Sequence, residues 1–310
     1  GALRQQGILE IPFRGILPAT LTTPGAVSSW GEAHKAYGRL PLSRVLASAI
    51  DYAREGFVIT ARVAGWLAPC EADLMPHEYS RQLFLAKGPL KAASVFSNPG
   101  LARTLEAIAS DGAQGFYRGE IGRMLADFSL SHGGVFDSDD LAAQYASWGE
   151  PICGTYRDLR LYETPAPTQG FTVIQMLQIL ESFDLPNKGY LSPEHVHLLV
   201  QAKQIAYHDR DRYLADPDFA NVPLDRLTSK GYANERRALI DPARALPWDK
   251  VPSYGSLTGD TVYIATIDEE GNAVSLIHSL YGAFGSTVVA GDTGVLLQNR
   301  SAYFSLDPAH

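Results

Sequence analysis

The chain has 310 residues, of which 45% are hydrophobic and 19% charged, and this composition is typical of soluble globular proteins. Its formal net charge is −8 and its Lys and Arg residues form no cluster, which argues against nucleic acid or an anionic membrane surface as a partner. No apolar run reaches the ~18 to 20 residues that a membrane-spanning helix requires.

The start of the chain carries no recognisable targeting signal. Residues 1–11 contain no Met and no apolar signal-peptide core, so they resemble the middle of a protein whose N-terminus is missing. A missing N-terminus carries no information on localisation, and we expect a cytoplasmic rather than a periplasmic protein. Cys70 and Cys153 are far apart in sequence and lack the spacing of a metal site. We expect two free buried thiols, with one disulfide as the alternative.

Helical patterns fill the first half of the chain. Residues 1–29 carry several prolines and glycines and are expected to form a loop. Ser29 is a suitable N-cap, and Gly38 a suitable end, for a helix over residues 30–37. Further helices are expected over residues 41–56, 60–87, 101–110 and 114–132.

Strand and helix patterns alternate after residue 137. A capping sequence at 137–141 predicts a short helix, and Ser192 followed by Pro193 predicts the start of the longest one. The other expected elements are strands at 151–156 and 158–163 and helices at 171–183, 192–213, 224–230 and 234–240. Helices first and a dense β region last predict an α+β or layered α/β protein.

The densest β pattern lies between residues 259 and 304. Four apolar runs, separated by turns that contain glycine, are expected to be strands at 262–267, 273–281, 287–290 and 295–297. Thr261 directly precedes the first of these strands. A rigid strand would hold the Thr261 side chain in a fixed direction.

Thr261 is the candidate nucleophile of this region. A threonine hydroxyl needs a neighbouring base, and an α-amino group, with a pKa of about 8, can be that base at neutral pH. Only the first residue of a chain supplies both groups, so this chemistry requires cleavage of the bond between Asp260 and Thr261. Spacing alone favours the ordinary role of a threonine at the start of a strand.

Motifs along nearly the whole chain resemble one known family. The matching residues are Pro24 to Val27, Trp30, His34, Ala53 to Phe57, Phe116 to Gly119, Gly133 with Gly134, Pro165 to Gln178, Tyr213 to Pro217, Thr261, Gly271 to Ser275 and Thr293 with Gly294. In this order they resemble the γ-glutamyltransferase family, a branch of the N-terminal-nucleophile hydrolases. Gln169 departs from the pattern, because the family has a glycine there.

The resemblance implies a fold and a pair of catalytic residues. The fold would be α+β, the four-layer αββα sandwich, made as a precursor that cuts itself between Asp260 and Thr261. Residues 1–260 would be part of the large subunit and residues 261–310 the start of the small subunit, within one composite domain. Thr261 aligns with the family's nucleophile, and Ser279 with a second hydroxyl residue that hydrogen-bonds to it. The alternative for Ser279 is a polar strand residue without a catalytic role.

The residues that bind substrate in this family differ here. Where γ-glutamyl enzymes hold the α-amino and α-carboxylate groups with Asn, with Gln or Glu, and with Asp, this chain has Tyr281, Arg300 and Tyr303. Arginine is suited to bidentate binding of a carboxylate. Residues 296–300 resemble the subgroup that includes oxamate amidohydrolase, so we expect a small anionic amide as substrate. A structural ion pair is the alternative role for Arg300.

These expectations lead to one main hypothesis, an amidohydrolase that works through an acyl-enzyme. The alternatives are a γ-glutamyltransferase or γ-glutamyl hydrolase, and a non-catalytic relative that binds a ligand. No metal or organic cofactor is implied, and the eight histidines do not cluster as metal ligands. The expected partners are the substrate and the chain's own cleaved subunit, with a dimer of such heterodimers as a further option. The family's glycine pair, which supplies the oxyanion hole, would lie beyond His310.

Overall fold

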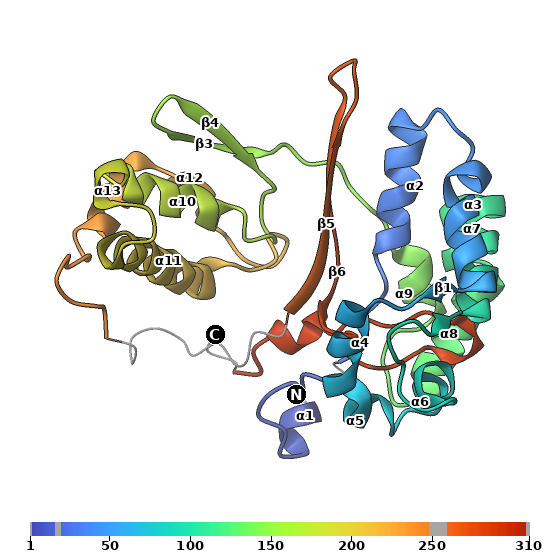
Figure 1. Cartoon of the computed structure of the whole chain (residues 1–310). Coiled ribbons are helices and arrows are strands. Elements are labelled where there is room, and N and C mark those ends of the chain that lie inside the picture. The colour runs from blue at the N-terminus through green and yellow to red at the C-terminus, as the bar shows by residue number, and fades with distance from the viewer. Residues whose placement is uncertain (1, 16–19, 248–258, 308–310) are drawn as a thin grey trace. The chain divides into compact units, whose positions relative to one another are not determined.

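The computed structural model describes residues 2–15, 20–247 and 259–307 (Figure 1). The chain forms two compact units, of which the first contains Gly1–Ser147 and Thr258–His310 and the second contains Trp148–Leu257. Within the described residues, no helix is long and apolar enough to cross a membrane. The combination of many helices with short antiparallel sheets confirms the expected α+β class.

The first unit is mainly helical. Its helices are α1 (Ala2–Gln5), α2 (Ala26–Tyr37), α3 (Leu42–Glu55), α4 (Ala61–Leu67), α5 (Glu71–Leu74), α6 (Glu78–Leu85), α7 (Pro99–Tyr117), α8 (Glu120–Ser131) and α9 (Ser138–Ala143). Its strands are β1 (Phe57–Val58), β2 (Val95–Phe96), β5 (Gly259–Ile267) and β6 (Ala273–Gly282), which pair as β1–β2 and β5–β6. Val288, Ala290 and Leu297 are buried in the core that α3, α7 and α8 form. The segment after β6 is therefore built into the helical core.

The second unit combines a hairpin with four described helices. In the hairpin, both strands lie close to their predicted positions, and β3 (Ile152–Tyr156) pairs antiparallel with β4 (Leu159–Glu163). The helices are α10 (Phe171–Leu180), α11 (Pro193–Tyr213), α12 (Leu224–Leu227) and α13 (Lys230–Arg237). Ile179, Leu198 and Ile205 join α10 to α11 in a buried cluster.

Both cysteines are free, but only one of them is buried. Cys70 is buried as expected, whereas Cys153 on β3 is exposed. The expectation of two buried thiols is therefore wrong for Cys153. The reason is the alternation of side chains along a strand. Gly154 is the residue of β3 that packs against α10, since a Cβ atom there would lie 2.2 Å from Cγ2 of Ile174. Its neighbour Cys153 points the other way.

Side-chain caps mark the start of α11, which was predicted, and the start of α7, which lies two residues before the predicted one. At α11, Ser192 Oγ accepts a hydrogen bond from His195 N at 3.1 Å. At α7, Asn98 Oδ1 accepts one from Leu101 N at 3.0 Å. In both cases a short polar side chain satisfies a backbone N–H that the first turn of a helix leaves unpaired.

Helix α2 begins at Ala26, earlier than the predicted start at residue 30. The hydroxyl of Tyr117, on α7, accepts a hydrogen bond from Ser28 N at 3.1 Å and donates one to Pro24 O at 2.8 Å. A distant tyrosine thus supports the first turn, and Ser29 lies inside the helix instead of capping it. The sequence near Ser29 contains no sign of this contact.

Glycine and proline positions explain two further differences among the helices. Helix α7 continues to Tyr117 through a kink at Gly112, whose φ is 63°, and the helix expected from residue 114 begins only at Glu120. Glycine adopts such a φ at little cost. The helix can therefore bend at Gly112 and continue to Tyr117. Pro69 and Pro76 divide residues 60–87 into α4, the 3-10 turn η1 (Ala68–Cys70), α5 and α6.

The two strands predicted within residues 287–297 do not form. A single bridge joins Val289 to Leu296, and three backbone hydrogen bonds connect residues 286–290 with residues 295–297, but no regular strand forms. Ser80, on α6, donates its hydroxyl to Thr287 O at 2.7 Å and accepts a hydrogen bond from Val289 N at 2.9 Å. Ser80 occupies the backbone groups on the edge of this segment that faces away from residues 295–297, so no further strand can pair there and the segment packs among helices.

Candidate functional site

Thr261 and Ser279 face each other across the long β5–β6 hairpin (Figure 1). They are direct partners in the antiparallel register, and Thr261 Oγ1 lies 3.0 Å from Ser279 Oγ, within hydrogen-bonding distance. Thr261 is exposed and Ser279 is half-buried. The hairpin therefore brings together the two hydroxyls that the family resemblance pairs, and it leaves the threonine accessible from solvent.

A bulge in β6 lies opposite the bond that precedes Thr261. The register shifts between Gly259 and Thr261, so that Leu280 and Tyr281 oppose Asp260 alone. Tyr281 absorbs the extra residue with a φ of 77°, an uncommon value for any residue other than glycine. Backbone strain of this kind is frequent beside functional sites. The backbone of Asp260 belongs to β5, and its side chain lies outside the described part of the structure.

Tyr281 links the hydroxyl pair to the other predicted substrate residues. Its N–H donates to Ser279 Oγ at 2.9 Å. The guanidinium carbon of Arg300 lies 4.7 Å from the centroid of the Tyr281 ring, a cation–π contact. The ring of Tyr303 meets the Tyr281 ring edge-on, with centroids 5.6 Å apart and an interplanar angle of 79°. The three residues predicted to bind substrate therefore form one cluster that is hydrogen-bonded to Ser279.

Arg300 is exposed at the start of the 3-10 turn η5 (Arg300–Tyr303). Its guanidinium carbon lies over the Tyr281 ring, 4.7 Å from the centroid, and this cation–π contact leaves the N–H groups available as donors. This is the geometry that bidentate binding of a carboxylate requires. Among the residues that the structure describes, Arg300 has no ion-pair partner, so the alternative role of a structural ion pair gains no support there.

Sequence reasoning missed the N-terminal segment that supports this cluster. The Phe13 ring lies 5.6 Å from the Tyr281 ring. Arg14 Nη1 donates to Ala283 O at 2.7 Å, across 269 positions of sequence, and Arg14 Nε pairs with Asp73 Oδ2 at 3.0 Å. A loop-like segment rich in proline and glycine contains no local signal for contacts at such a separation.

Sequence reasoning also missed the fully buried Asn299. Its Nδ2 donates to Phe13 O at 2.6 Å, and its Oδ1 accepts a hydrogen bond from Gly282 N at 2.9 Å. One signal was present, because Asn299 lies in the same short segment as Arg300, which was used for the resemblance. That segment was interpreted only for its exposed arginine.

The tip of the hairpin is held by charged and polar groups. Asp268 Oδ2 accepts a hydrogen bond from Asn272 Nδ2, and its Oδ1 accepts one from Asn272 N, both at 2.8 Å. These bonds, the side-chain bond first, hold the pKa of the Asp268 carboxyl below its usual value. Arg39, in the connection between α2 and α3, forms an ion pair with Glu270 at 3.5 Å. The tip is therefore fixed independently of the hydroxyl pair.

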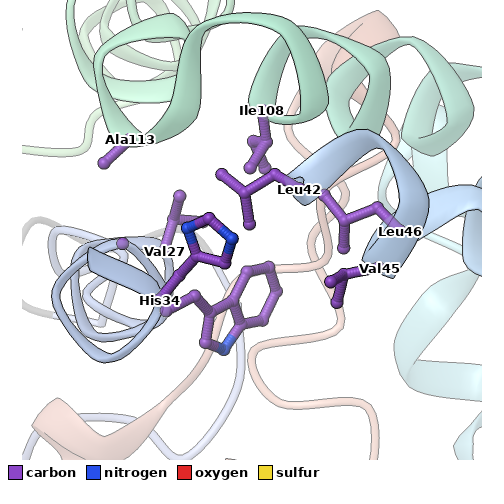
Figure 2. A pocket seen from close by; sticks show the side chains of 9 residues that line it. Val27, His34, Leu42, Val45, Leu46, Ile108 and Ala113 are labelled. Carbon is purple, nitrogen blue, oxygen red and sulfur yellow. The ribbon is translucent and has the colours of Figure 1, made fainter. Parts of the chain in front are cut away.

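A separate hollow lies among α2, α3 and α7, and none of the predicted site residues lines it (Figure 2). Its volume is about 220 Å³, below the ~300 to 1,000 Å³ that is usual for small-molecule sites. His34 is the one titratable group in its lining, and His34 Nε2 is 2.7 Å from Leu40 O. An apolar hollow of this kind does not suit an anionic amide. Among the described residues, no group of His, Cys, Asp and Glu side chains is arranged to hold a metal ion.

A comparison with known proteins identifies the family. The family model for gamma-glutamyltranspeptidase matches residues 4–310. The chain belongs to the gamma-glutamyltranspeptidase family. This match confirms the resemblance that the ordered motifs indicated in the sequence.

Individual members of the gamma-glutamyltranspeptidase family resemble the chain along almost its whole length. A glutathione hydrolase-like proenzyme of Bacillus subtilis is 40% identical over 306 residues, which are 98% of this chain and 57% of that protein. The oxamate amidohydrolase proenzyme of Klebsiella pneumoniae is 36% identical over 310 residues, again 98% of this chain and 57% of that protein. The chain thus spans little more than half the length of these curated relatives.

A solved structure agrees with the sequence comparisons. The crystal structure of cephalosporin acylase from Bacillus halodurans has a TM-score of 0.89 and 36% identity, covering 100% of this chain and 57% of that one. This likeness confirms the predicted fold class of the N-terminal-nucleophile hydrolases. Within the described residues the sheets are only two-stranded, so the fold is recognised from this likeness and not from the strand count.

Proposed function

We propose that the chain carries the nucleophile and part of the substrate site of an autoprocessing amidohydrolase for small carboxylate-bearing amides. The observation that carries the proposal is the 3.0 Å contact between Thr261 Oγ1 and Ser279 Oγ across a rigid ladder. A hydroxyl that is hydrogen-bonded to a positioned neighbour is held in one direction, as a nucleophile requires. Both of these curated relatives are named proenzymes, which supports a cleaved precursor.

The cleavage step uses the same hydroxyl as the later reaction. Thr261 Oγ1 attacks the carbonyl carbon of Asp260, the C–N bond breaks, the proton of the hydroxyl passes to the departing nitrogen, and the acyl group is left on oxygen as an ester. Water then hydrolyses the ester, which releases the Asp260 carboxylate and leaves Thr261 with a free α-amino group. Residues 1–260 and 261–310 would then belong to two subunits of one composite domain. The bulge at Tyr281 lies opposite this bond and interrupts the ladder there.

Turnover follows from the new α-amino group. This amine, whose pKa is about 8 in the unperturbed state, accepts the proton of the Thr261 hydroxyl as that hydroxyl attacks the substrate amide carbon. The proton passes to the departing nitrogen, ammonia or an amine leaves, and water resolves the acyl-enzyme. Ser279 holds the hydroxyl during attack. These steps use only side chains and the chain terminus.

The substrate half of the proposal rests on Arg300. Its guanidinium carbon lies 4.7 Å from the centroid of the Tyr281 ring, and Tyr281 N–H is bound to Ser279, so Arg300 belongs to the cluster that adjoins the hydroxyl pair. In oxamate the amide is joined directly to a carboxylate. The similarity to the oxamate amidohydrolase of Klebsiella pneumoniae, at 36% identity, supports this substrate class.

A γ-glutamyl hydrolase is the second candidate. It is favoured by the glutathione hydrolase proenzyme of Escherichia coli, which is 36% identical over 294 residues. The cluster of Tyr281, Arg300 and Tyr303 disfavours it, because no acidic group of that cluster could hold the α-ammonium group of a γ-glutamyl substrate.

The experiment compares the purified full-length protein with two threonine variants. Thr261→Ala should remain a single chain on a denaturing gel and by intact mass, and it should release no ammonia from oxamate. Thr266→Ala is the matched control, because Thr266 is an exposed residue of the same strand and pairs with Val274. It should be cleaved and active like the wild type. The proposal is wrong if Thr261→Ala retains activity. Parallel assays with γ-glutamyl and glutaryl amides distinguish the two substrate classes, and a folded wild type inactive on all three would indicate a binding protein.

A further inference from the structure

A single buried side chain, Asn299, connects the chain segments that surround Tyr281. Its Nδ2 donates to Phe13 O at 2.6 Å in the N-terminal segment, and its Oδ1 accepts from Gly282 N at 2.9 Å at the end of β6. Its backbone N–H donates to Leu280 O at 3.1 Å. Asn299 is also the residue that directly precedes η5, the turn that carries Arg300 and Tyr303.

The bulge depends on these bonds for its backbone hydrogen bonding. An extra residue in one strand leaves backbone groups that the partner strand does not pair. Here Leu280 O and Gly282 N are both bound by Asn299, and Tyr281 N is bound by Ser279 Oγ. Asn299 thus supplies an acceptor for Gly282 N and a donor for Leu280 O, in place of the backbone groups of a regular partner strand.

Only an amide side chain fits this position. Asparagine presents one acceptor and two donors on a planar group, and Asn299 uses both kinds at once. Aspartate at this site would keep the bond from Gly282 N but would turn an oxygen toward Phe13 O. The space is also tight, since a Cβ atom on Gly282 would lie 2.7 Å from the Phe13 ring and 3.2 Å from Asn299 Nδ2.

We infer that Asn299 is a positioning residue for the cleavage of the chain before Thr261. By holding the bulge, it directs Tyr281 N–H onto Ser279 Oγ, and Ser279 in turn holds the Thr261 hydroxyl beside the bond to be cut. The same bulge places the Tyr281 ring under Arg300. Asn299 touches neither the nucleophile nor the substrate and acts through these neighbours. The inference rests on the proposed function.

The test measures the rate of cleavage in freshly synthesised precursor, followed on a denaturing gel. In Asn299→Leu, which removes both side-chain bonds, we expect cleavage to slow about tenfold, the effect of losing one well-placed hydrogen bond. Asn299→Asp keeps the acceptor for Gly282 N but loses the donor to Phe13 O, so its rate should lie between those of Asn299→Leu and the wild type. Partial rescue by the conservative variant separates positioning from a general loss of stability.

A second buried asparagine serves as the matched control. Asn98 also makes two side-chain bonds, to Gly294 O at 2.9 Å and from Leu101 N at 3.0 Å, but it caps α7 and does not contact the bulge. Asn98→Leu should lower the thermal stability and leave the cleavage rate of the folded precursor unchanged.

Three outcomes would overturn the inference. They are a wild-type rate in Asn299→Leu, an equal loss of rate in Asn299→Leu and Asn299→Asp, and an equal loss of rate in Asn98→Leu. If the wild type itself stays a single chain, the proposed function fails first and takes the inference with it. That result is seen without any variant, so the two failures are distinguishable.

Discussion

The hydroxyl pair of the β5–β6 hairpin and the buried carboxylate of α11 show two ways in which this chain holds a polar group. Asp209 is fully buried, and it accepts hydrogen bonds from Arg236 Nε at 2.9 Å and from Gln175 Nε2 at 2.6 Å. A second bond comes from Arg236 Nη2. Thr261, by contrast, is exposed and has one hydroxyl partner at 3.0 Å.

The difference separates a structural polar site from a reactive one. The Asp209 oxygens are saturated with donors and closed to solvent, so that carboxylate can hold α11, α10 and α13 together but can reach no substrate. Burial also lowers the pKa of its partner Arg236. Thr261 has an accessible oxygen, and the paired backbone of the hairpin holds its side chain in position. We therefore expect mutations at Asp209 to change stability, and mutations at the hairpin to change chemistry.

Asp209→Ala should have the largest effect on stability. It would leave the guanidinium of Arg236 half-buried without a counter-ion, and breaking a buried pair in this way costs about 3 to 5 kcal/mol. Urea unfolding, followed by circular dichroism, measures the change. Asp218→Ala, at an exposed position, is the control and should change the free energy of unfolding by less than ~0.5 kcal/mol. If the two variants were equally stable, Asp209 would not be the anchor that its contacts indicate.

Ser279→Ala should have the opposite effect, a large loss of reaction rate with little loss of stability. Losing the hydroxyl removes the partner of Thr261 Oγ1 and the acceptor for Tyr281 N–H, so cleavage and turnover should each fall about tenfold to a hundredfold. The change in stability should stay below ~1 kcal/mol, because the site is only half-buried. Ser279→Thr keeps the hydroxyl and should keep most of the rate. Gel-based cleavage and ammonia release measure both steps, and full activity in Ser279→Ala would leave Ser279 as an ordinary strand residue.

Arg300→Lys should affect substrate binding without affecting cleavage. Lysine keeps the charge but loses the bidentate fork and the flat face that stacks on Tyr281, so KM for oxamate should rise about tenfold while the chain is still cleaved at the wild-type rate. Arg300→Met, which also removes the charge, should raise KM further. Steady-state kinetics on oxamate provide the comparison. An unchanged KM in both variants would exclude Arg300 as the carboxylate-binding residue.

Asp268→Ala should have the smallest effect, and that effect should depend on pH. The folded-state pKa of Asp268 is lowered from its ordinary value of 3.8, so the ionised carboxyl stabilises the folded hairpin. This contribution is fully present above the ordinary pKa and is lost as the pH falls through the folded pKa. Thermal melting should therefore show a small difference between wild type and variant at pH 7, and the difference should disappear at the acid end. A constant difference at every pH would assign the effect to the shape of the turn.

Local signals in the sequence predicted much of the architecture. The cap at Ser192, the strands of the β3–β4 hairpin and the alternation of β5 and β6 depend on neighbouring residues, and the structure has them where the sequence indicates. The errors have long-range causes instead. Helix α2 starts early because Tyr117 supports its first turn, and residues 287–290 do not extend a sheet because Ser80, on α6, binds the backbone of their outer edge.

The sequence by itself determined the family, the candidate nucleophile Thr261 and its hydroxyl partner Ser279, because these depend on residue identity and order. Only the tertiary structure decided how Tyr281, Arg300 and Tyr303 meet, and that Phe13 and Asn299 support them. The physical reason is the separation along the chain. A hydrogen bond between Asn299 and Phe13 crosses 286 positions, and no local pattern encodes the folding that brings these two residues together.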